Sequence, residues 1–282
     1  MIVFFNGSFI DKDKVAISPD DRGFLFADGI YEVVRWYRSY FFAFNEHMDR
    51  LKRSLGEIRI ELNEKPDFFS IAMNLVKEND LMGKDAILYF QITRGVAKRN
   101  HPFPEPNVKP TIYIALSAFQ PASELRVSGI KAISLPDERW SRCDIKSVGL
   151  LPNILAKQTA IESGAYEAIL VRNGNITEAS HSNVFGVRAG TVITHPDSGF
   201  VLPGIARKVS LELCKDLGIP VKLTPIQFTE LENMDELFIT NTSGEVLGIH
   251  TLDGRKVSGG QPGIITNILN EAFITYREAR KS

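Results

Sequence analysis

Hydrophobic and polar residues alternate in short runs and elsewhere recur at helical spacing, a combination that predicts a mixed α/β protein. The apolar segments 2–5 and 9–17 flank Asn6-Gly7, which is a strong signal for a β-hairpin. Further strands are expected at 28–35, 86–93, 111–119, 167–172, 175–178, 184–188, 191–194 and 236–240. Helices are expected at 46–55, 66–79, 153–164, 204–217 and 263–279.

Two of these helices carry more detailed expectations. Asn45 is a plausible N-cap for the first, whose buried stripe would be Met48, Leu51, Leu55 and Ile58. His47 and Arg50 share another face, which is either a solvated surface or a small cationic ledge for an anion. In the helix 153–164 we expect Leu155, Ala156 and Thr159 to face inward and Gly164 to end the helix.

The chain has 282 residues, enough for two modest domains that each bury a core. We predict an N-terminal α/β domain at 1–119, a linker at 120–128 and a C-terminal domain at 129–282. No internal repeat or low-complexity segment stands out in the sequence.

Composition and charge narrow the class of protein. Hydrophobic residues make up 44% and charged residues 24%, as in ordinary folded enzymes. A net charge of -1 argues against recruitment of nucleic acid or anionic membrane. Cys143 and Cys214 are too few for a disulfide framework and predict reduced thiols in a cytoplasmic protein. The start of the chain lacks a basic leader, and no apolar run approaches the roughly 18–20 residues of a membrane span.

Motifs of several common enzyme classes are absent from the sequence. It has no Walker A, HExxH, GxSxG or GxGxxG pattern. Its five histidines are scattered and show no metal-ligand spacing. Serine hydrolysis and metal-dependent hydrolysis therefore lose support, and no metal is expected.

The remaining polar signals suggest a different chemistry. Lys146 follows Arg142-Cys143-Asp144-Ile145, and Glu178 follows the Asn173-Gly174 turn. If two adjacent strands brought them together, they could hold a planar cofactor by its aldehyde and its ring nitrogen. The helix that opens at Gly204 offers backbone N–H groups to a phosphate, although Pro203-Gly204 also fits an ordinary turn before a helix. The polar cluster 241–244 could meet the same phosphate, and the whole set fits pyridoxal 5′-phosphate.

Substrate contacts are suggested in the N-terminal half. Arg99 and His101, two apart in a proline-rich loop, point to the same side and suit a carboxylate, although such a pair is also a common surface feature. Tyr31 lies near the start of a strand, where it either faces a cavity or is a half-buried strand aromatic.

With these residues assembled, the chain resembles the fold-type IV pyridoxal-phosphate enzymes of the class IV aminotransferase family, and within them the D-amino acid aminotransferases. The matching segments are 28–33, 45–51, 142–147, 166–170, 177–178, 182–186 and 234–238. Their order and spacing together are highly specific. The resemblance implies a two-domain α/β fold of the α+β type, with a small N-terminal α/β domain and a larger, barrel-like C-terminal domain.

The resemblance also implies roles for individual residues. Lys146 would carry the cofactor and then move a proton between the substrate Cα and C4′ of the cofactor. Glu178 would pair with the pyridine nitrogen, and Leu202 would pack near the ring. The residues implied for the phosphate are Arg50, Ile205, Ala206 and Thr242, with Ile205 and Ala206 acting through their backbone N–H groups. Tyr31, Arg99 and His101 would bind the substrate carboxylate, and the loop of Arg99 and His101 would reach into the neighbouring subunit of a homodimer.

Three positions depart from the pattern of the family: Ala206 stands where a threonine is common, Ala27 where glycine is frequent, and His181 in a stretch of small residues. The expected reaction is reversible transamination between D-amino acids such as D-alanine and 2-oxo acids such as 2-oxoglutarate. The alternatives are a branched-chain L-amino acid aminotransferase, a lyase of the aminodeoxychorismate type, and a non-enzymatic cofactor-binding module. The Arg99–His101 pair favours the first reading, because a protein that only holds the cofactor needs no carboxylate site.

Overall fold

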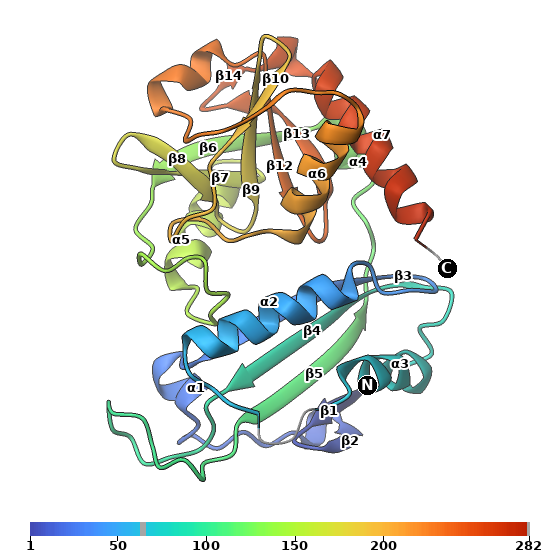
Figure 1. Ribbon diagram of the computed structural model, residues 1–282, viewed down its shortest axis with the longest axis vertical. Coiled ribbons are helices and arrows are strands. Elements are labelled where there is room, and N and C mark those ends of the chain that lie inside the picture. The colour runs from blue at the N-terminus through green and yellow to red at the C-terminus, as the bar shows by residue number, and fades with distance from the viewer. Residues whose placement is uncertain (63–65, 281–282) are drawn as a thin grey trace. The chain divides into compact units, whose positions relative to one another are not determined.

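A computed structural model describes residues 1–62 and 66–280, which form two compact units (Figure 1). The first unit comprises Met1–Gln120 and Ile145–Gly149, and the second comprises Pro121–Asp144 and Leu150–Ser282. The short segment with Lys146 thus groups with the first unit, whereas we had assigned it to the C-terminal domain. The predicted linker 120–128 contains a short helix, α4 (Glu124–Ser128). As boundaries of independently folding domains, the predicted limits stay a prediction.

The first unit is built on an antiparallel sheet with the strand order β2-β1-β5-β4-β3. Its strands are β1 (Ile2–Phe5), β2 (Ser8–Asp11), β3 (Gly29–Tyr37), β4 (Asp85–Thr93) and β5 (Thr111–Ala118). Its helices are the 3-10 turn η1 (Lys12–Lys14), α1 (Arg22–Phe26), α2 (Phe44–Glu57) and α3 (Phe68–Glu78). The hairpin predicted at Asn6-Gly7 is confirmed, with φ values of 47° and 93°. Its second strand is shorter than predicted, because η1 replaces the strand from Lys12 onward.

Helices α2 and α3 cover the same face of this sheet. The alternate β4 residues Ala86, Leu88, Phe90 and Ile92 are fully buried there. The Phe90 ring lies 6.4 Å from Phe44 of α2 and 5.5 Å from Phe68 of α3. Because strand side chains alternate between faces, Glu32 of β3 points toward α2 while Tyr31 points to the opposite face. There the ring of Tyr31 lies 5.9 Å from that of Tyr89.

The start of α2 differs from the prediction. The helix begins at Phe44, so Asn45 lies inside it and the cap assignment is wrong. The N-cap is Ala43, whose φ of 49° is left-handed and which provides no side-chain cap. The turn out of β3 dictates where the helix begins, since Phe42 N donates to Arg35 O at 3.0 Å.

The second unit is a curled sheet with the strand order β11-β10-β9-β12-β13-β6-β7-β8, with β14 paired to β13. Its strands are β6 (Ile130–Pro136), β7 (Glu167–Arg172), β8 (Asn175–Ala179), β9 (Asn183–Arg188), β10 (Thr191–Thr194), β11 (Val221–Leu223), β12 (Glu236–Asn241), β13 (Glu245–Leu252) and β14 (Arg255–Lys256). The pairs β6–β7, β6–β13 and β10–β11 are parallel, and the other pairs are antiparallel. The hairpins predicted at Asn173-Gly174 and Ala189-Gly190 are confirmed.

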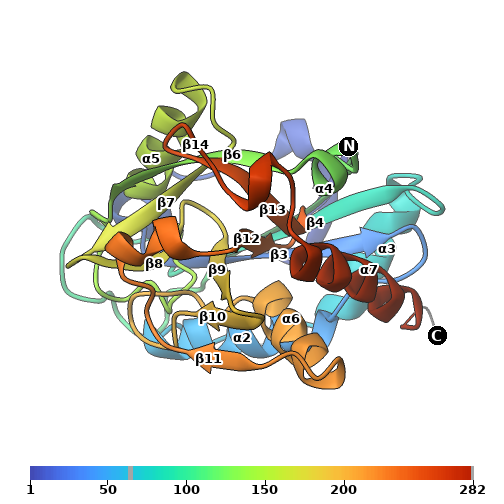
Figure 2. The same cartoon turned by 90° about the horizontal axis from the view of Figure 1, so that it is seen from above.

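The core of the second unit lies inside the curl of its sheet. Apolar side chains from β7, β9, β12 and β13 meet there, among them Ile169, Val184, Leu237 and Ile249. The helices are α5 (Leu151–Glu162), α6 (Ile205–Asp216) and α7 (Ile264–Glu278), with the 3-10 turns η2 (Phe228–Asn233) and η3 (Ser258–Gly260). Helices α6 and α7 lie next to each other (Figure 2), and the Tyr276 hydroxyl donates to Glu212 at 3.1 Å.

The inward face of α5 was predicted only in part. Ala156 is buried as expected, but Leu155 is 58% exposed and Thr159 is also exposed. The helix packs on β6 and β7 through Ala156 and Ala160, since small side chains at i and i+4 allow a close approach to the sheet. Gly164 follows the end of the helix with a φ of 69°, as the helix-ending role requires.

Residues 1–62 and 66–280 offer neither a membrane-spanning helix nor a cluster of metal ligands. In this part of the chain, no helix combines the length and hydrophobicity of a membrane span. Likewise, residues 1–62 and 66–280 contain no group of three or more His, Cys, Asp or Glu side chains placed to hold a metal ion.

Candidate active site

Lys146 is pinned by its backbone to β3 and α2 of the first unit. Tyr31 N donates to Lys146 O at 2.9 Å, and Lys146 N donates to the Ser54 hydroxyl of α2 at 3.4 Å. The neighbouring residue Ser147 forms a bridge with Ile30. The side-chain Nζ lies 4.1 Å from the centre of the Tyr31 ring, a distance at which the ring attracts an ammonium group. The structure therefore brings the predicted lysine and the predicted substrate tyrosine together.

The expectation that two adjacent strands carry Lys146 and Glu178 is wrong. Lys146 lies outside the strands and is bound to β3, whereas Glu178 lies on β8, whose ladder partner is β7. The two residues belong to different units. The sequence could not reveal that Lys146 groups with the first unit. Only the five residues Ile145–Gly149 belong to that unit, and the residues on both sides belong to the second.

His47 and Arg50 form neither a solvated face nor an open ledge. Both are buried and bind the carboxylate of Glu32, which is itself fully buried. Arg50 donates to the two Glu32 oxygens at 2.6 and 2.9 Å, and His47 Nδ1 lies 2.8 Å from Glu32 Oε2. Burial acts to raise the pKa of Glu32, but Arg50 and His47 outweigh it and lower that pKa far below its usual range. Burial, together with the nearby charges of Arg50 and Lys146, lowers the pKa of His47.

The buried carboxylate orients Arg50. Two of its nitrogens, Nε and Nη2, are directed at Glu32, which fixes the plane of the guanidinium. A guanidinium carries its N–H donors in a rigid fork, so fixing its plane also fixes the direction of each donor. The phosphate role of Arg50 stays a prediction.

Arg99 and His101 gather around one aromatic ring of α1. The guanidinium of Arg99 lies 5.2 Å from the centre of the Phe26 ring, and the His101 ring lies 5.6 Å from it. Both residues are exposed in the described structure. The two side chains therefore reach the same place, as the sequence predicted.

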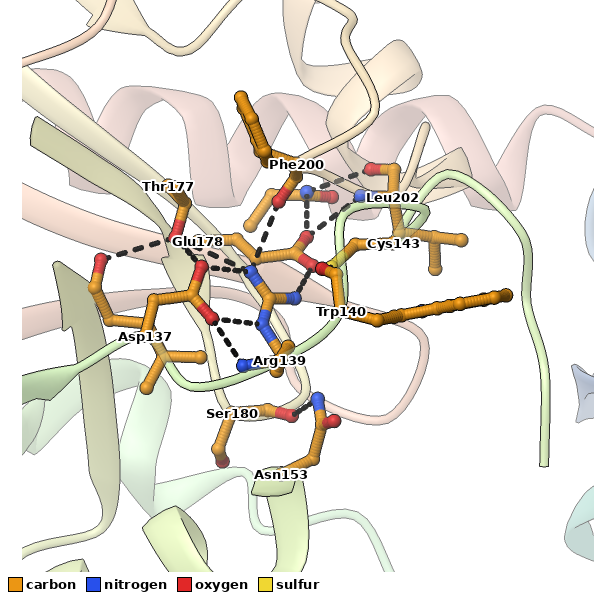
Figure 3. A network of polar contacts seen from close by, with 12 residues as sticks. Asp137, Arg139, Trp140, Cys143, Asn153, Thr177, Glu178, Ser180, Phe200 and Leu202 are labelled. Atoms are coloured by element: carbon orange, nitrogen blue, oxygen red, sulfur yellow. Dashed lines mark hydrogen bonds and ion pairs between the residues drawn. The ribbon is translucent and has the colours of Figure 1, made fainter. Parts of the chain in front are cut away.

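Glu178 is the centre of the polar network in the second unit (Figure 3). Its Oε1 accepts a hydrogen bond from Arg139. Its Oε2 accepts from Asn183 Nδ2 and from the backbone N–H of Leu202, each at 3.0 Å. All three partners are donors, and such an environment favours the charged carboxylate. Leu202, predicted to pack near the ring, thus also contributes its backbone N–H.

Arg139 connects Glu178 to a second carboxylate and was missed in the sequence. It donates to Asp137 through Nε and Nη2, each at 2.9 Å, and to the carbonyl of Phe200 at 3.0 Å. These carboxylates raise the pKa of Arg139, although burial opposes this shift. Burial raises the pKa of the neighbouring Cys143 thiol to about 11. The available signal was the i,i+2 spacing of Asp137 and Arg139 next to a strand end.

The N-terminus of α6 has the form of an anion site. The N-cap is Gly204 and gives no side-chain cap, so the N–H groups of Ile205 and Ala206 begin a helix whose carbonyls cannot reach them. Asn183 Nδ2 donates to Leu202 O at 2.9 Å, which links this turn to Glu178. A Cβ on residue 204 would lie 2.0 Å from Asn183 Oδ1, so glycine is required there by the close approach.

The turn that carries Thr242 is tied to the β8–β9 connection. Asn241 Oδ1 accepts from the N–H groups of Ser243 and Gly244 at 3.1 and 2.6 Å, and Asn241 Nδ2 donates to the Ser182 hydroxyl at 2.9 Å. Ser182 in turn donates to the buried carboxylate of Glu167 at 2.9 Å. Thr242 therefore sits on a turn with a fixed backbone.

His181, the unusual residue of the β8–β9 connection, binds the same carboxylate. Its Nδ1 lies 2.9 Å from Glu167 Oε2, and its side chain remains 40% exposed. Burial acts to raise the pKa of Glu167, but His181 and Ser180 lower it overall. The histidine thus adds a charge-assisted contact to a carboxylate that already accepts from serine hydroxyls.

The chain matches known proteins over nearly all of its length. Residues 29–252 match the model of the family described as amino-transferase class IV. The chain belongs to the class IV aminotransferase family. One similar relative is named D-alanine aminotransferase, from Staphylococcus haemolyticus, with 41% identity and 99% of both chains covered. Another of that name, from Bacillus licheniformis, is 38% identical over 97% of this chain and 96% of its own.

Solved structures of class IV aminotransferases share the fold. A branched-chain amino acid aminotransferase from Escherichia coli is 25% identical, has a TM-score of 0.90, and is matched over 98% of this chain and 94% of its own. The predicted fold, a mixed α/β structure of fold type IV with a barrel-like sheet, is confirmed.

Class IV aminotransferases use pyridoxal 5′-phosphate, and the residues present fit that group. Lys146 offers an amine to an aldehyde, and Glu178 offers a carboxylate to a protonated ring nitrogen. The opening of α6 offers backbone N–H groups to a phosphate. Ala206 carries no hydroxyl, so there the fit depends on the backbone alone.

Proposed function

We propose that this class IV aminotransferase reversibly transfers an amino group between D-amino acids such as D-alanine and 2-oxo acids such as 2-oxoglutarate. The observation that carries the proposal is the level of similarity. Two relatives named D-alanine aminotransferase are 41% and 38% identical across almost the whole chain. The similar branched-chain enzyme is 25% identical.

Lys146 is assigned the proton transfer. When bound, pyridoxal 5′-phosphate supplies an aldehyde for the amino group and a ring that accepts the electron pair of the substrate Cα. Once the substrate amine has displaced it from the aldehyde, the freed amine of Lys146 would take the proton from the substrate Cα and hold it for return. Its backbone bonds to Tyr31 and Ser54 support this role, because a fixed main chain limits where Nζ can reach.

Glu178 is assigned to the ring nitrogen. Arg139, Asn183 and Leu202 hold its two oxygens from fixed directions, so the carboxylate is oriented before anything binds. A charged carboxylate stabilises a proton on the pyridine nitrogen and so strengthens the ring as an electron acceptor. The N–H groups of Ile205 and Ala206, with Thr242 and Arg50, are assigned to the phosphate.

Arg99, His101 and Tyr31 are assigned to the substrate carboxylate. The convergence of Arg99 and His101 on Phe26 supports a shared target for their donors. An arginine and a histidine together offer a charge and several N–H groups, which suits the carboxylate of an α-amino acid.

A branched-chain L-amino acid aminotransferase is the second candidate. It is favoured by the TM-score of 0.90 with the enzyme from Escherichia coli, although the identity is lower. The two candidates differ in the hand of the substrate and in the size of its side chain.

A homodimer and a cytoplasmic location are part of the proposal. The free cysteines Cys143 and Cys214, both buried, are consistent with a reducing compartment. Sedimentation equilibrium tests the dimer, and a monomer at all concentrations would contradict it.

The test of function uses the purified protein, loaded with pyridoxal 5′-phosphate, and either D- or L-alanine with 2-oxoglutarate. The expected result is pyruvate and glutamate from the D-isomer only. In a parallel assay with L-leucine as the amino donor, turnover of L-leucine with no turnover of D-alanine would establish a branched-chain L-amino acid aminotransferase instead. Pyruvate from aminodeoxychorismate, with no turnover of either alanine, would point to a lyase.

A further inference from the structure

The backbone of the loop that carries Arg99 and His101 is bound by the buried guanidinium of Arg22. Arg22 of α1 donates to the carbonyl of Asn100 at 2.6 Å, and its nitrogens lie 3.4 Å from Pro102 O and 3.5 Å from His101 O. Three consecutive carbonyls of an otherwise irregular segment thus face one side chain. Arg22 is 4% exposed, whereas Asn100, His101 and Pro102 are exposed, so a buried side chain holds the backbone of a surface loop.

Asp28 aims this guanidinium. Its Oδ2 accepts from Arg22 Nε at 2.8 Å and from Arg94 Nε at 2.7 Å, and its Oδ1 accepts from Arg94 Nη2 at 2.9 Å. Burial acts to raise the pKa of Asp28, but the two arginines lower it overall, so the carboxylate stays charged. Because its Nε is bound to Asp28, the far edge of the Arg22 guanidinium is directed at the loop.

Arg94 anchors the same carboxylate to the end of α2. It donates to Ile58 O at 2.7 Å and to Arg59 O at 3.0 Å. Its guanidinium also lies 3.8 Å from the centre of the Phe103 ring, further along the loop. The loop is therefore held through backbone at one place and through an aromatic ring at another.

Helix α1 also provides the surface on which the two loop side chains meet. Phe26 lies one helical turn after Arg22, whose guanidinium is 4.8 Å from the centre of the ring. The same ring is the one that Arg99 and His101 approach. One short helix thus binds the loop backbone and brings the side chains of Arg99 and His101 to one aromatic ring.

We propose that Arg22, aimed by Asp28, is a positioning residue for substrate selection: it fixes the backbone of residues 100–102 so that Arg99 and His101 receive a carboxylate together. The inference rests on the carboxylate role assigned to these two residues under the proposed function. A loop ordered in advance loses less conformational entropy on binding than a mobile one. Less of the interaction free energy is then offset by ordering the loop, and the substrate binds more tightly.

The test compares Arg22→Lys and Arg22→Met with Arg38→Met. Lysine keeps the charge but cannot span three carbonyls with a planar fork. Arg38 is the matched control, since it also pairs with an aspartate in the first unit, Asp85 at 3.1 Å, but on the surface. Each holoenzyme is assayed with D-alanine and 2-oxoglutarate for kcat and KM. Trypsin cleavage after Lys98 and Arg99 is followed in parallel.

For Arg22→Lys we expect KM to rise at least about 10-fold for both substrates, with kcat changed by less than about 3-fold, the signature of lost substrate binding. Cleavage after Lys98 and Arg99 should accelerate while the melting temperature stays close to that of the wild type. Arg22→Met should show the same changes more strongly, and Arg38→Met should show neither.

An unchanged KM and unchanged cleavage in Arg22→Lys would overturn the proposal, as would a fall in kcat with KM unaltered. If Arg22→Met does not fold, Arg22→Lys and Phe26→Leu test the proposal instead. Phe26→Leu should raise KM without faster cleavage, because it alters the ring but leaves the backbone contacts of Arg22 in place. The proteolysis measurement does not depend on activity, so it distinguishes failure of the Arg22 proposal from failure of the proposed function. A wild-type protein inactive with D-alanine would contradict the function while leaving the cleavage comparison valid.

Discussion

In the first unit one carboxylate, Asp28, binds two arginines, whereas in the second unit one arginine, Arg139, binds two carboxylates. In the first arrangement the arginine edges that point away from Asp28 are directed at backbone carbonyls, and the loop bearing cationic side chains is fixed as a result. In the second, Arg139 fixes Glu178. Under the proposed function, the same type of ion pair orders a site for a substrate anion in one unit and presents an anion to the cofactor in the other.

The two arrangements also differ in how they are completed. Asn183 and the Leu202 N–H bind Glu178 directly, so the residue assigned to chemistry is itself inside the network. Arg99 and His101 lie outside the Asp28 network and depend on it through their backbone. We therefore expect substitutions in the second network to lower stability and catalysis together, and substitutions in the first to weaken substrate binding, with a smaller loss of stability.

Arg139→Met should have the largest effect on stability. It leaves Asp137 and Glu178 buried without their shared cation, and breaking a buried ion pair costs about 3–5 kcal/mol. Urea unfolding should therefore give a free energy of unfolding lower by that amount. Arg188→Met removes a partly exposed pair with Glu230 in the same unit and should cost about 0–1 kcal/mol. Equal losses in the two variants would erase the distinction between the units.

Glu178→Gln should come next and act on catalysis. Loss of a preorganised charge typically lowers kcat by about 10²–10³-fold, equivalent to about 2.7–4 kcal/mol. The control is Glu236→Gln, which alters another buried carboxylate of the second unit, one that accepts from the first N–H groups of α7. Steady-state assays should show the loss for Glu178→Gln alone. A Glu178→Gln enzyme with wild-type kcat would remove the ring-nitrogen role.

Asp28→Asn should have a smaller, pH-dependent effect. The folded pKa of Asp28 lies below its usual value of 3.8, so its stabilisation is present above that value and is lost as pH falls through the lower folded pKa. At neutral pH the variant should be less stable by about 1.5–3 kcal/mol, the worth of hydrogen bonds to a charged group. Denaturant unfolding should show this gap closing below about pH 4. A gap that widens with acid would contradict the assignment.

The smallest effect concerns the thiols. Burial raises the pKa of both Cys143 and Cys214 to about 11, so at pH 8 only about one thiol in a thousand is ionised. Labelling of the native protein with a disulfide reagent should be slow and should accelerate about 10-fold per pH unit above pH 8. Rapid labelling at pH 7 would show that the network around Arg139 opens readily to water.

The sequence predicted the elements of both sheets because their signals are local. Short apolar runs marked β4 and β9, and the Asn173-Gly174 turn fixed a hairpin through its left-handed backbone. Motif order indicated the family, and Arg99 with His101 were found by spacing alone.

What the sequence missed depends on contacts between distant residues. Arg22, Asp28 and Arg94 converge only when α1, β3 and β4 are folded, and Glu32 meets Arg50 only because α2 crosses β3. The placement of Lys146 with the first unit likewise follows from backbone bonds to Tyr31 and Ser54. Local patterns carry no record of such pairings, and for this reason the face of His47 was read as solvated or open.

The central claim is that Lys146 carries the cofactor and moves the proton. The most direct measurement is reduction of the cofactor-loaded protein with borohydride, followed by proteolysis and mass spectrometry of the peptide that contains residues 142–147. The account predicts a phosphopyridoxyl group on Lys146, and neither the label nor transaminase activity in Lys146→Ala. A label on another lysine, or an active Lys146→Ala enzyme, would contradict it.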